Sequence, residues 1–206
     1  MSVDKSTLEF YAREAARYNS IVQEEKFPPL FDAFVARLTS GASVLDFGCG
    51  GGRAALALQR RGFAVTALDP SAEMLAGLDG SGIPTICGDI ESLPLDAKFD
   101  AVLALFSLQH IPRDDLAASL ARLCASISAG GTIAIAIHEG DESVRDALDR
   151  LYNHWSEASL REMLAQSGLT VDWVEREPSK GFDGRRFTAL YLLAARPPVD
   201  APHPAA

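Results

Sequence analysis

Three acidic residues follow short apolar segments, and the first of them stands just before a run of glycines. Asp46 precedes the glycines within residues 48–52, Asp69 ends one apolar run, and Asp89 follows another. Carboxylates in the first two of these places could bind an ammonium group and a ribose diol. Glycines let the chain turn tightly and bring backbone N–H groups close to a ligand. The pattern predicts a site for a nucleotide-like ligand that carries a positive charge.

Each carboxylate also has a simpler explanation. Asp46 could cap the amides of its own turn, and Asp69 could cap a following helix, although Ser71 is equally placed to do so. Three acidic residues at three successive strand ends are hard to explain as three independent caps. Residues 50–55 also satisfy the loose G-x-G-x-x-A pattern of nicotinamide-dependent oxidoreductases. A carboxylate at position 46 would make no favourable contact with a pyrophosphate, which is also an anion. This argues against a nicotinamide-dependent oxidoreductase.

The elements that position these residues alternate between strands and helices. Apolar runs without strict alternation predict strands covered on both faces, at 44–45, 64–68, 85–87, 101–106 and 132–137. Helical spacing between them predicts helices at 54–61, 72–78 and 116–127. Strand–helix alternation with right-handed crossovers predicts a doubly wound α/β sheet.

Both flanks of this region have patterns of their own. A polar helix is expected at 7–19, and a second one from Leu30 to Gly41. After the central strands, 141–152 predicts a charged helix, and Ser156 can cap another that ends at Gly168. The runs 169–175 and 187–195 predict two antiparallel strands, because no helix-length segment separates them. The proline-rich tail at 197–206 is expected to be disordered.

The composition of the chain argues against several classes of binding partner. The chain has 206 residues, a formal net charge of −9, and three cysteines that form no C-x-x-C pair. The acidic balance argues against nucleic acid and anionic membranes. No apolar stretch approaches the ~20 residues of a membrane span, and no polar cluster has metal-ligand spacing. We therefore expect a cytoplasmic protein, a monomer or homodimer, with no bound metal.

The sequence resembles the class I S-adenosylmethionine-dependent methyltransferases of the small single-domain kind. The resemblance spans roughly residues 7–196 and rests on Val-Leu-Asp-Phe-Gly-Cys-Gly-Gly-Gly (44–52), Ala-Leu-Asp-Pro-Ser-Ala-Glu-Met-Leu (67–75), Gly-Asp-Ile-Glu-Ser-Leu-Pro-Leu (88–95) and Phe-Asp-Ala-Val-Leu-Ala-Leu-Phe-Ser-Leu-Gln-His-Ile (99–111). It implies a mostly parallel, doubly wound, seven-stranded sheet with a C-terminal antiparallel strand and helices on both faces. It also implies helices at 1–40 that form a lid over the cofactor, a Rossmann-like core at 41–196 and the tail at 197–206.

The implied cofactor is S-adenosylmethionine, with S-adenosylhomocysteine as product. Asp46 would face its amino group, Asp69 its ribose, and Asp89 with the Ile90 amide its adenine. The other implied contacts are Gly48, Cys49, Gly50, Pro70, Met74, Leu105 and the tyrosines Tyr11 and Tyr18 of the lid. The two tyrosines could equally be packing residues beneath a helix.

The implied activity is in-line methyl transfer to an unidentified acceptor, for which a small molecule is expected. A base is needed only for a hydroxyl or protonated amine, and His110 is the candidate. His138, Tyr152 and Trp155 are candidates to touch the acceptor. The alternative is a regulatory or interaction module that binds S-adenosylmethionine without turnover.

Overall fold

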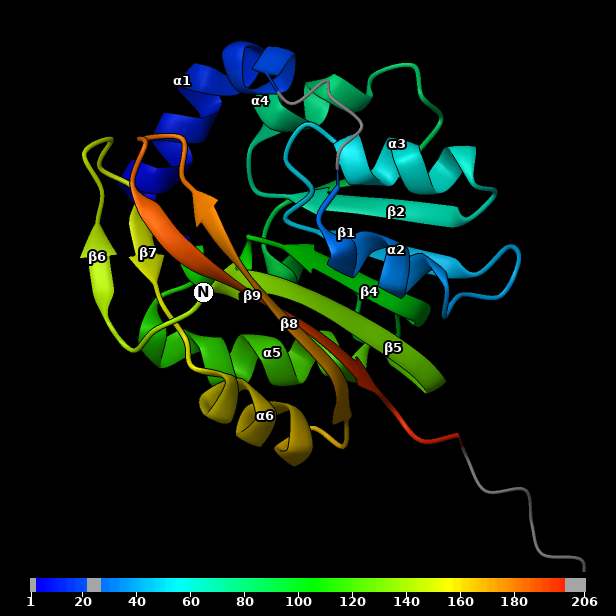
Figure 1. The fold of residues 1–206 in the computed structure, drawn as a ribbon. Helices are drawn as coiled ribbons and strands as arrows, with labels where there is room; N and C mark the ends of the chain where they lie inside the picture. The colour runs from blue at the N-terminus through cyan, green and yellow to red at the C-terminus, as the bar shows by residue number, and fades with distance from the viewer. Residues whose placement is uncertain (1–2, 22–26, 199–206) are drawn as a thin grey trace, which may run out of the picture.

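A computed structural model describes residues 3–21 and 27–198, without the side chains of Tyr18 and Ile21. Within these residues seven strands form one sheet in the order β3-β2-β1-β4-β5-β9-β8 (Figure 1). The strands of the sheet are β1 (Ser43–Phe47), β2 (Ala64–Asp69), β3 (Thr85–Cys87), β4 (Phe99–Leu105), β5 (Ile127–His138), β8 (Thr170–Lys180) and β9 (Arg186–Ala195). The first five run parallel, and β9 is antiparallel to both β5 and β8. This is the predicted doubly wound sheet.

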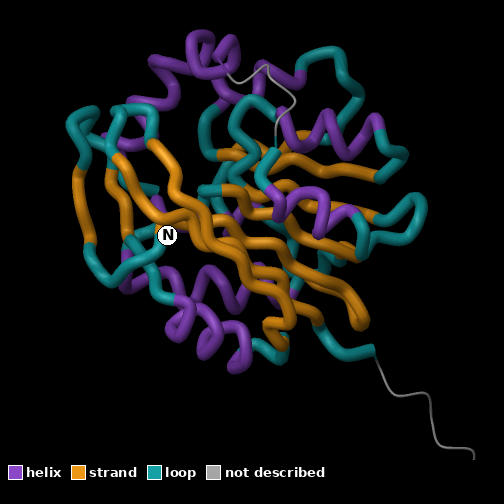
Figure 2. The backbone as a smooth tube through the Cα atoms, viewed as in Figure 1, coloured by secondary structure: helices purple, strands orange, loops and turns teal. Residues whose placement is uncertain are grey.

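The helices cover both faces of the sheet, as the layers in Figure 2 show. They are α1 (Lys5–Ile21), α2 (Pro29–Val35), α3 (Arg53–Arg60), α4 (Ala72–Leu75), α5 (Leu116–Ala125) and α6 (Glu157–Gln166), with short 3-10 turns η1 (Ala76–Leu78), η2 (Ile90–Ser92), η3 (Leu108–His110) and η4 (Arg113–Asp115). One apolar cluster joins α5 and α6 to the sheet, and a second joins α2 and α3 to its other face. Successive side chains of a strand point to opposite faces of the sheet, so both faces are buried where neighbouring residues are apolar. In β1, Val44 belongs to the second cluster and Leu45 to the first, and both are fully buried.

Local sequence signals set the helix starts at several places. Pro29 occupies the first turn of α2, where its missing N–H costs nothing. The Ser71 hydroxyl accepts a hydrogen bond from the Met74 N–H at 3.2 Å and caps α4. Ser156 caps α6 in the same way. Ser71 thus takes the capping role that had been one explanation of Asp69.

The helix predicted at 141–152 is wrong, because this segment is a hairpin of β6 (Ser143–Arg145) and β7 (Leu151–Asn153). The Asp146 carboxylate accepts hydrogen bonds from the backbone N–H groups of Leu148 and Arg150, at 3.0 and 2.9 Å. Asp149 adopts the left-handed conformation with φ of 64°. An aspartate that binds its own backbone in this way competes with helix formation.

The other differences from the sequence predictions are small shifts in where helices and strands begin or end. Helix α2 ends at Val35, six residues before the predicted stop at Gly41, and Ile127 belongs to β5 and not to the preceding helix. Strands β8 and β9 extend into the predicted loop, which leaves a short turn between Lys180 and Arg186. The predicted tail lies outside the described residues from 199 onward.

Candidate cofactor and acceptor site

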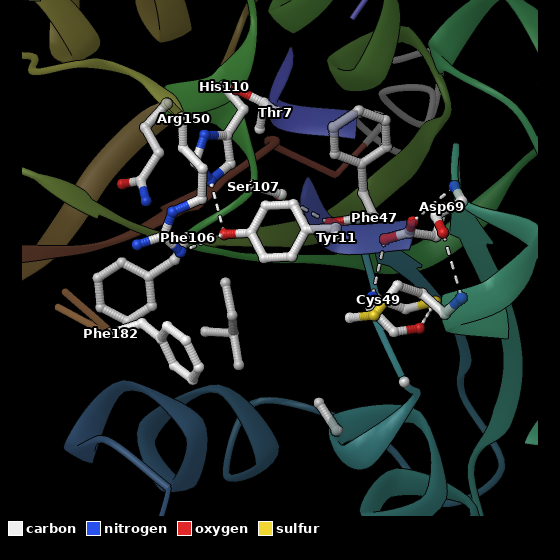
Figure 3. A pocket seen from close by; sticks show the side chains of 18 of the residues that line it. Thr7, Tyr11, Phe47, Cys49, Asp69, Phe106, Ser107, His110, Arg150 and Phe182 are labelled. Carbon is white, nitrogen blue, oxygen red and sulfur yellow. Dashed lines mark hydrogen bonds between the residues drawn. The ribbon is translucent and has the colours of Figure 1, made fainter. Parts of the chain in front are cut away.

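A cavity of about 390 Å³ lies at the carboxyl ends of the parallel strands. Residues after β1, β2 and β4 form its floor, and residues of α1 and of the β8–β9 turn line it from the other side. Figure 3 shows Asp69 and Cys49 at one end, His110, Arg150 and Phe182 at the other, and Tyr11 between them. Ligands of open α/β sheets bind at this edge, and the volume is that of a small-molecule site.

Asp46 lines the cavity at the end of β1 with only 2 % of its surface exposed. Burial raises the pKa of this carboxyl group to about 7, although the Ala55 backbone N–H hydrogen-bonds to it and works in the opposite direction. Its Oδ2 atom is buried and has no hydrogen-bond partner among the described residues. A buried carboxylate oxygen without a partner is costly unless a ligand supplies a donor. Capping of backbone N–H groups therefore explains the hydrogen bond from Ala55, but it does not explain the Oδ2 atom of Asp46, which has no partner among the described residues.

Asp69 joins the end of β2 to the glycine turn. Its two carboxylate oxygens accept hydrogen bonds from the N–H groups of Gly50 at 2.8 Å and Ser71 at 2.9 Å. Burial raises its pKa in spite of these two contacts. Each oxygen keeps a lone pair for a further donor, such as a ligand hydroxyl.

The glycine turn is needed for packing as well as for ligand approach. Gly48 has φ of 67°, and a Cβ atom there would collide with the side chain of Ser107. A Cβ at Gly51 would collide in the same way with Asn19 of α1. At Gly48 the left-handed backbone and the close Ser107 side chain together require glycine, whereas Gly51 has no left-handed backbone and only the end of the Asn19 side chain would have to move. The Cys49 thiol donates a weak hydrogen bond to the Gly50 carbonyl, and burial raises its pKa, so this thiol is neutral.

Most of the predicted cofactor residues gather around the cavity. Those that line it are Tyr11, Asp46, Gly48, Cys49, Gly50, Asp69, Pro70, Met74 and Leu105. Asp89 and Ile90 do not line it: the Asp89 carboxylate accepts a hydrogen bond from the Glu91 N–H at 3.0 Å, and the Ile90 side chain is buried in the core. The side chain of Tyr18 lies outside the described residues. The roles of these three residues stay predictions.

His110 lies at the far end of the cavity, with both ring nitrogens engaged. Its Nδ1 is 2.7 Å from the Leu151 carbonyl oxygen, and its Nε2 is 3.2 Å from the Tyr11 hydroxyl. A carbonyl can only accept, so Nδ1 carries the hydrogen and the Tyr11 hydroxyl donates to Nε2. Burial lowers the pKa of His110 to about 4, which keeps the imidazole neutral.

Arg150 completes this row of hydrogen bonds and was not anticipated from the sequence. Its Nη1 atom donates to the Tyr11 hydroxyl at 3.2 Å, and its Nε and Nη2 atoms donate to the Asp146 carboxylate at 3.0 and 2.7 Å. The side chains of this ion pair are 2 % and 3 % exposed. Burial opposes the charge on Asp146, but hydrogen bonds from the Arg150 backbone and guanidinium outweigh it and lower the pKa of the carboxyl group. The sequence pattern predicts only a charged helix for the segment 141–152, which contains Arg150.

His138 and Tyr152 also line the cavity, whereas Trp155 does not. The His138 imidazole is stacked between the rings of Tyr152 and Phe187, with centroids 4.9 and 3.5 Å away. Burial, helped by His154 and His110, lowers the pKa of His138 to about 3. Trp155 lies instead beneath the Arg113 guanidinium, 4.3 Å from its ring centroid. Its predicted contact with the acceptor therefore has no support from its position.

Phe106 adopts a left-handed backbone with φ of 55° directly after β4. A non-glycine residue in this region costs of order 1–3 kcal/mol and is frequent at functional sites. Its N–H still donates to the Ala136 carbonyl at 2.8 Å, which fixes the turn against β5. The sharp turn brings both Leu105 and Phe106 to the cavity wall.

Helix α1 is attached to the β6–β7 hairpin by polar contacts. Arg145 donates two hydrogen bonds to the Asp4 carboxylate, at 3.1 and 2.8 Å, and the Leu151 N–H donates to the Thr7 hydroxyl at 2.8 Å. The Arg145 hydrogen bonds are the main reason why the pKa of Asp4 is lowered to about 2. At the tip of the other hairpin, the Phe182 ring meets Phe10 of α1 edge to face, at 6.0 Å.

Two negative observations apply to residues 3–21 and 27–198. No group of three or more His, Cys, Asp or Glu side chains is placed to hold a metal ion. No helix there is both long enough and apolar enough to cross a bilayer.

Comparisons with known proteins agree with the site. A family profile described as a methyltransferase domain matches residues 44–131. A ubiquinone biosynthesis O-methyltransferase of Methylobacterium nodulans is 30 % identical over 188 residues, covering 76 % of this chain and 73 % of the relative. Another, from Xanthomonas campestris pv. campestris, is 38 % identical over 116 residues, covering 52 % of this chain and 47 % of the relative. The chain thus spans about half the length of the first relatives that it matches.

A solved structure extends the similarity to the whole fold. The 1,6-didemethyltoxoflavin-N1-methyltransferase of Burkholderia thailandensis, solved with its acceptor and S-adenosylhomocysteine, superposes with a TM-score of 0.77. It is 24 % identical, and the match covers 93 % of this chain and 88 % of that one. The fold and the carboxylate-edged cavity define a Rossmann-like protein with a nucleotide-type site. The chain belongs to the class I S-adenosylmethionine-dependent methyltransferases, and the resemblance seen in the sequence is confirmed.

Proposed function

We propose that this chain transfers a methyl group from S-adenosylmethionine to a small-molecule acceptor. The observation that carries the proposal is the buried Asp46 oxygen without a partner among the described residues, which lines a cavity beside the glycine turn. A cofactor that carries an ammonium group supplies the donor that this oxygen lacks. The names of the relatives, ubiquinone biosynthesis O-methyltransferase and 1,6-didemethyltoxoflavin-N1-methyltransferase, support a small-molecule acceptor.

The lining residues fit the parts of this cofactor. Asp46 and the backbone of Gly48 and Gly50 would hold the methionine part, with Leu105 opposite. Asp69 would accept hydrogen bonds from the ribose hydroxyls through its remaining lone pairs. Pro70 and Met74 would contact the adenine. Contacts of Asp89 and Ile90 with the adenine would require the segment 88–92 to approach the cavity.

When bound, S-adenosylmethionine would supply a methyl group activated by its sulfonium, the acceptor lone pair would displace the sulfur, and any acceptor proton would pass to water. The residues of the chain align and enclose the reacting groups, and alignment alone is worth about 7–11 kcal/mol in intramolecular systems. We propose α1 as a lid that excludes water, since it meets both hairpins over the cavity. His110 holds Tyr11 in place, because both of its nitrogens are already engaged.

The test combines binding with turnover. Calorimetry should show that S-adenosylmethionine and S-adenosylhomocysteine bind, that a nicotinamide dinucleotide does not, and that Asp46→Asn weakens both interactions. Incubation with methyl-labelled S-adenosylmethionine and a panel of small acceptors should then transfer the label. Saturable binding with no transfer to any acceptor would favour the alternative, a binding module without turnover. Absence of binding would refute the proposal.

A further inference from the structure

Aromatic rings line the far end of the cavity, and among them the His138 imidazole has nitrogen atoms that form no hydrogen bond with the described residues. Both faces of the His138 ring are covered, by Tyr152 at 14° and by Phe187 at 21° from parallel. Only the edge of the imidazole, which carries the two nitrogens, is left to form hydrogen bonds. The residue is 8 % exposed, and among the described residues its ring has no hydrogen-bond partner. The His138 ring nitrogens are not among the fully buried side-chain atoms that lack a partner, so they are reached from the cavity, where a ligand can form hydrogen bonds with them.

The charges at this end are already balanced. Arg150 is the buried cation there, and the Asp146 carboxylate pairs with it through two hydrogen bonds. An anionic acceptor would therefore meet no uncompensated positive charge in the interior. Lys180 also lines the cavity, but it is exposed, so water and salt screen its ammonium group.

A cationic acceptor is disfavoured for a separate reason. Aromatic rings attract cations through their faces, but Arg150 already occupies this position beside the rings. Its guanidinium carbon lies 4.7 to 5.8 Å from four ring centroids, those of Phe10, Tyr11, Tyr152 and Phe182. A second cation among these rings would be repelled by the first. An uncharged ring instead gains contacts with these aromatic rings, of about 0.5–1.5 kcal/mol for each good pair.

We propose that the methyl acceptor is an uncharged aromatic compound that presents a hydroxyl or a ring N–H to the edge of His138. This inference rests on the proposed function. A neutral imidazole has one donor and one acceptor nitrogen, so it can accept a hydrogen bond from either group. Burial and the neighbouring histidines lower the pKa of His138 to about 3, which keeps the ring in this form. His138 thereby selects and orients the acceptor.

The experiment measures the binding of matched probes to the full chain loaded with S-adenosylhomocysteine, by calorimetry and ligand-observed NMR. Para-cresol, para-hydroxybenzoate and tyramine share a phenol and differ in charge at neutral pH. Benzimidazole presents a neutral ring N–H, and cyclohexanol is the aliphatic control. We expect para-cresol or benzimidazole to bind at least about tenfold more tightly than the two charged phenols and cyclohexanol. Comparison of the first two shows which donor the site takes.

Substitutions then test the contact with His138. His138→Phe keeps a flat ring between Tyr152 and Phe187 and should weaken the preferred probe about tenfold, without changing the affinity for S-adenosylhomocysteine. His138→Asn, which keeps polar edge atoms, should recover part of the loss. His154→Asn is the matched control, because its ring lies 5.3 Å from that of His138 but does not line the cofactor cavity.

Several results would overturn the inference: a charged phenol that binds best, cyclohexanol that binds as well as para-cresol, no probe that binds the loaded protein, or His138→Phe with unchanged probe affinity. Failure of S-adenosylhomocysteine itself to bind would instead refute the proposed function.

Discussion

The Asp69 carboxylate accepts a hydrogen bond from the backbone N–H of Gly50 at 2.8 Å, which ties the end of β2 to the turn after β1. The same carboxylate accepts from Ser71, so one side chain fixes two segments of the cavity. A ligand held by Asp69 is therefore coupled to the shape of the glycine turn.

Asp69→Asn should weaken the binding of S-adenosylmethionine by about 1.5–3 kcal/mol, the range for a hydrogen bond to a charged group. The amide also places an NH₂ group where one of the two N–H donors now points. Calorimetry measures the affinity, with Ser71→Ala as control: loss of this helix cap should cost about 1 kcal/mol of stability and little affinity. Equal effects of the two variants on affinity would contradict the ribose role.

Gly48→Ala should destabilise the fold far more than Gly62→Ala. Both residues have positive φ, but a Cβ at Gly62 has no atom within 4 Å, whereas one at Gly48 collides with Ser107. The left-handed backbone costs about 1–2 kcal/mol at either site, and overpacking adds about 1–3 kcal/mol at Gly48 alone. Urea unfolding measures both variants. Equal destabilisation would show that Ser107 moves away without cost.

The affinity for S-adenosylmethionine should fall with acid because of Asp46. Burial raises the pKa of this group to about 7, so below that pH the carboxyl group is protonated in the free protein. If the ligand requires the carboxylate, affinity drops by up to about tenfold per pH unit below 7. Calorimetry from about pH 5 to about pH 8 would show this slope. The slope should be missing in Asp46→Asn.

Two neutral histidines should make the fold less stable in acid. The pKa values of His110 and His138 are lowered from 6.5 to about 4 and about 3, so between these values and 6.5 the unfolded chain binds more protons. Stability is therefore complete above 6.5 and falls with decreasing pH, by up to about 1.4 kcal/mol per pH unit for each histidine. Burial is the main cause for His110; Arg150 acts in the same direction, whereas Asp146 and Asp4 raise the pKa of His110. Urea unfolding of His110→Asn at several pH values should give a shallower slope than the parent chain.

Arg145→Ala tests whether α1 acts as a lid. The Arg145 side chain is 42 % exposed and that of Asp4 is 14 % exposed, so solvent screens the pair in part and global stability should change by no more than about 1 kcal/mol. The dissociation rate of S-adenosylhomocysteine should nevertheless rise, by at most about fivefold, because the helix loses one of its attachments to the hairpin. Stopped-flow displacement measures this rate. Lys5→Ala removes another exposed pair of the same helix, with Glu9, and should leave the rate unchanged.

The sequence predicts the sheet, and it predicts that Asp46, Asp69 and the glycine turn come together, because both depend on local patterns. Two-face burial of β1 follows from its consecutive apolar residues, and Asp46 and Asp69 follow from their places at strand ends. The acceptor end could not be predicted in this way. One part of it is Arg150, which lies in a segment whose pattern predicts only a charged helix. The other part is a set of contacts between Tyr11, His110 and Leu151, which are distant in the chain.

The hairpin at 143–153 shows the limit most directly. Its alanine, leucine and arginine residues favour a helix, and the outcome depends on the side chain of Asp146, which binds two backbone N–H groups and a guanidinium. The buried Arg150 is stabilised by aromatic rings from α1 and from the β8–β9 turn. Such long-range partners leave no periodic signal in the segment itself.

The contact between Phe10 and Phe182 joins the beginning of the described chain to its last strand pair across the ligand cavity. During synthesis on a ribosome, a chain that still lacks β9 has no antiparallel partner to hold the Phe182 turn in place. The parallel core can form earlier, but a complete chamber exists only when the final strand has been added. Tight retention of a small molecule would therefore report that translation of this unit has finished.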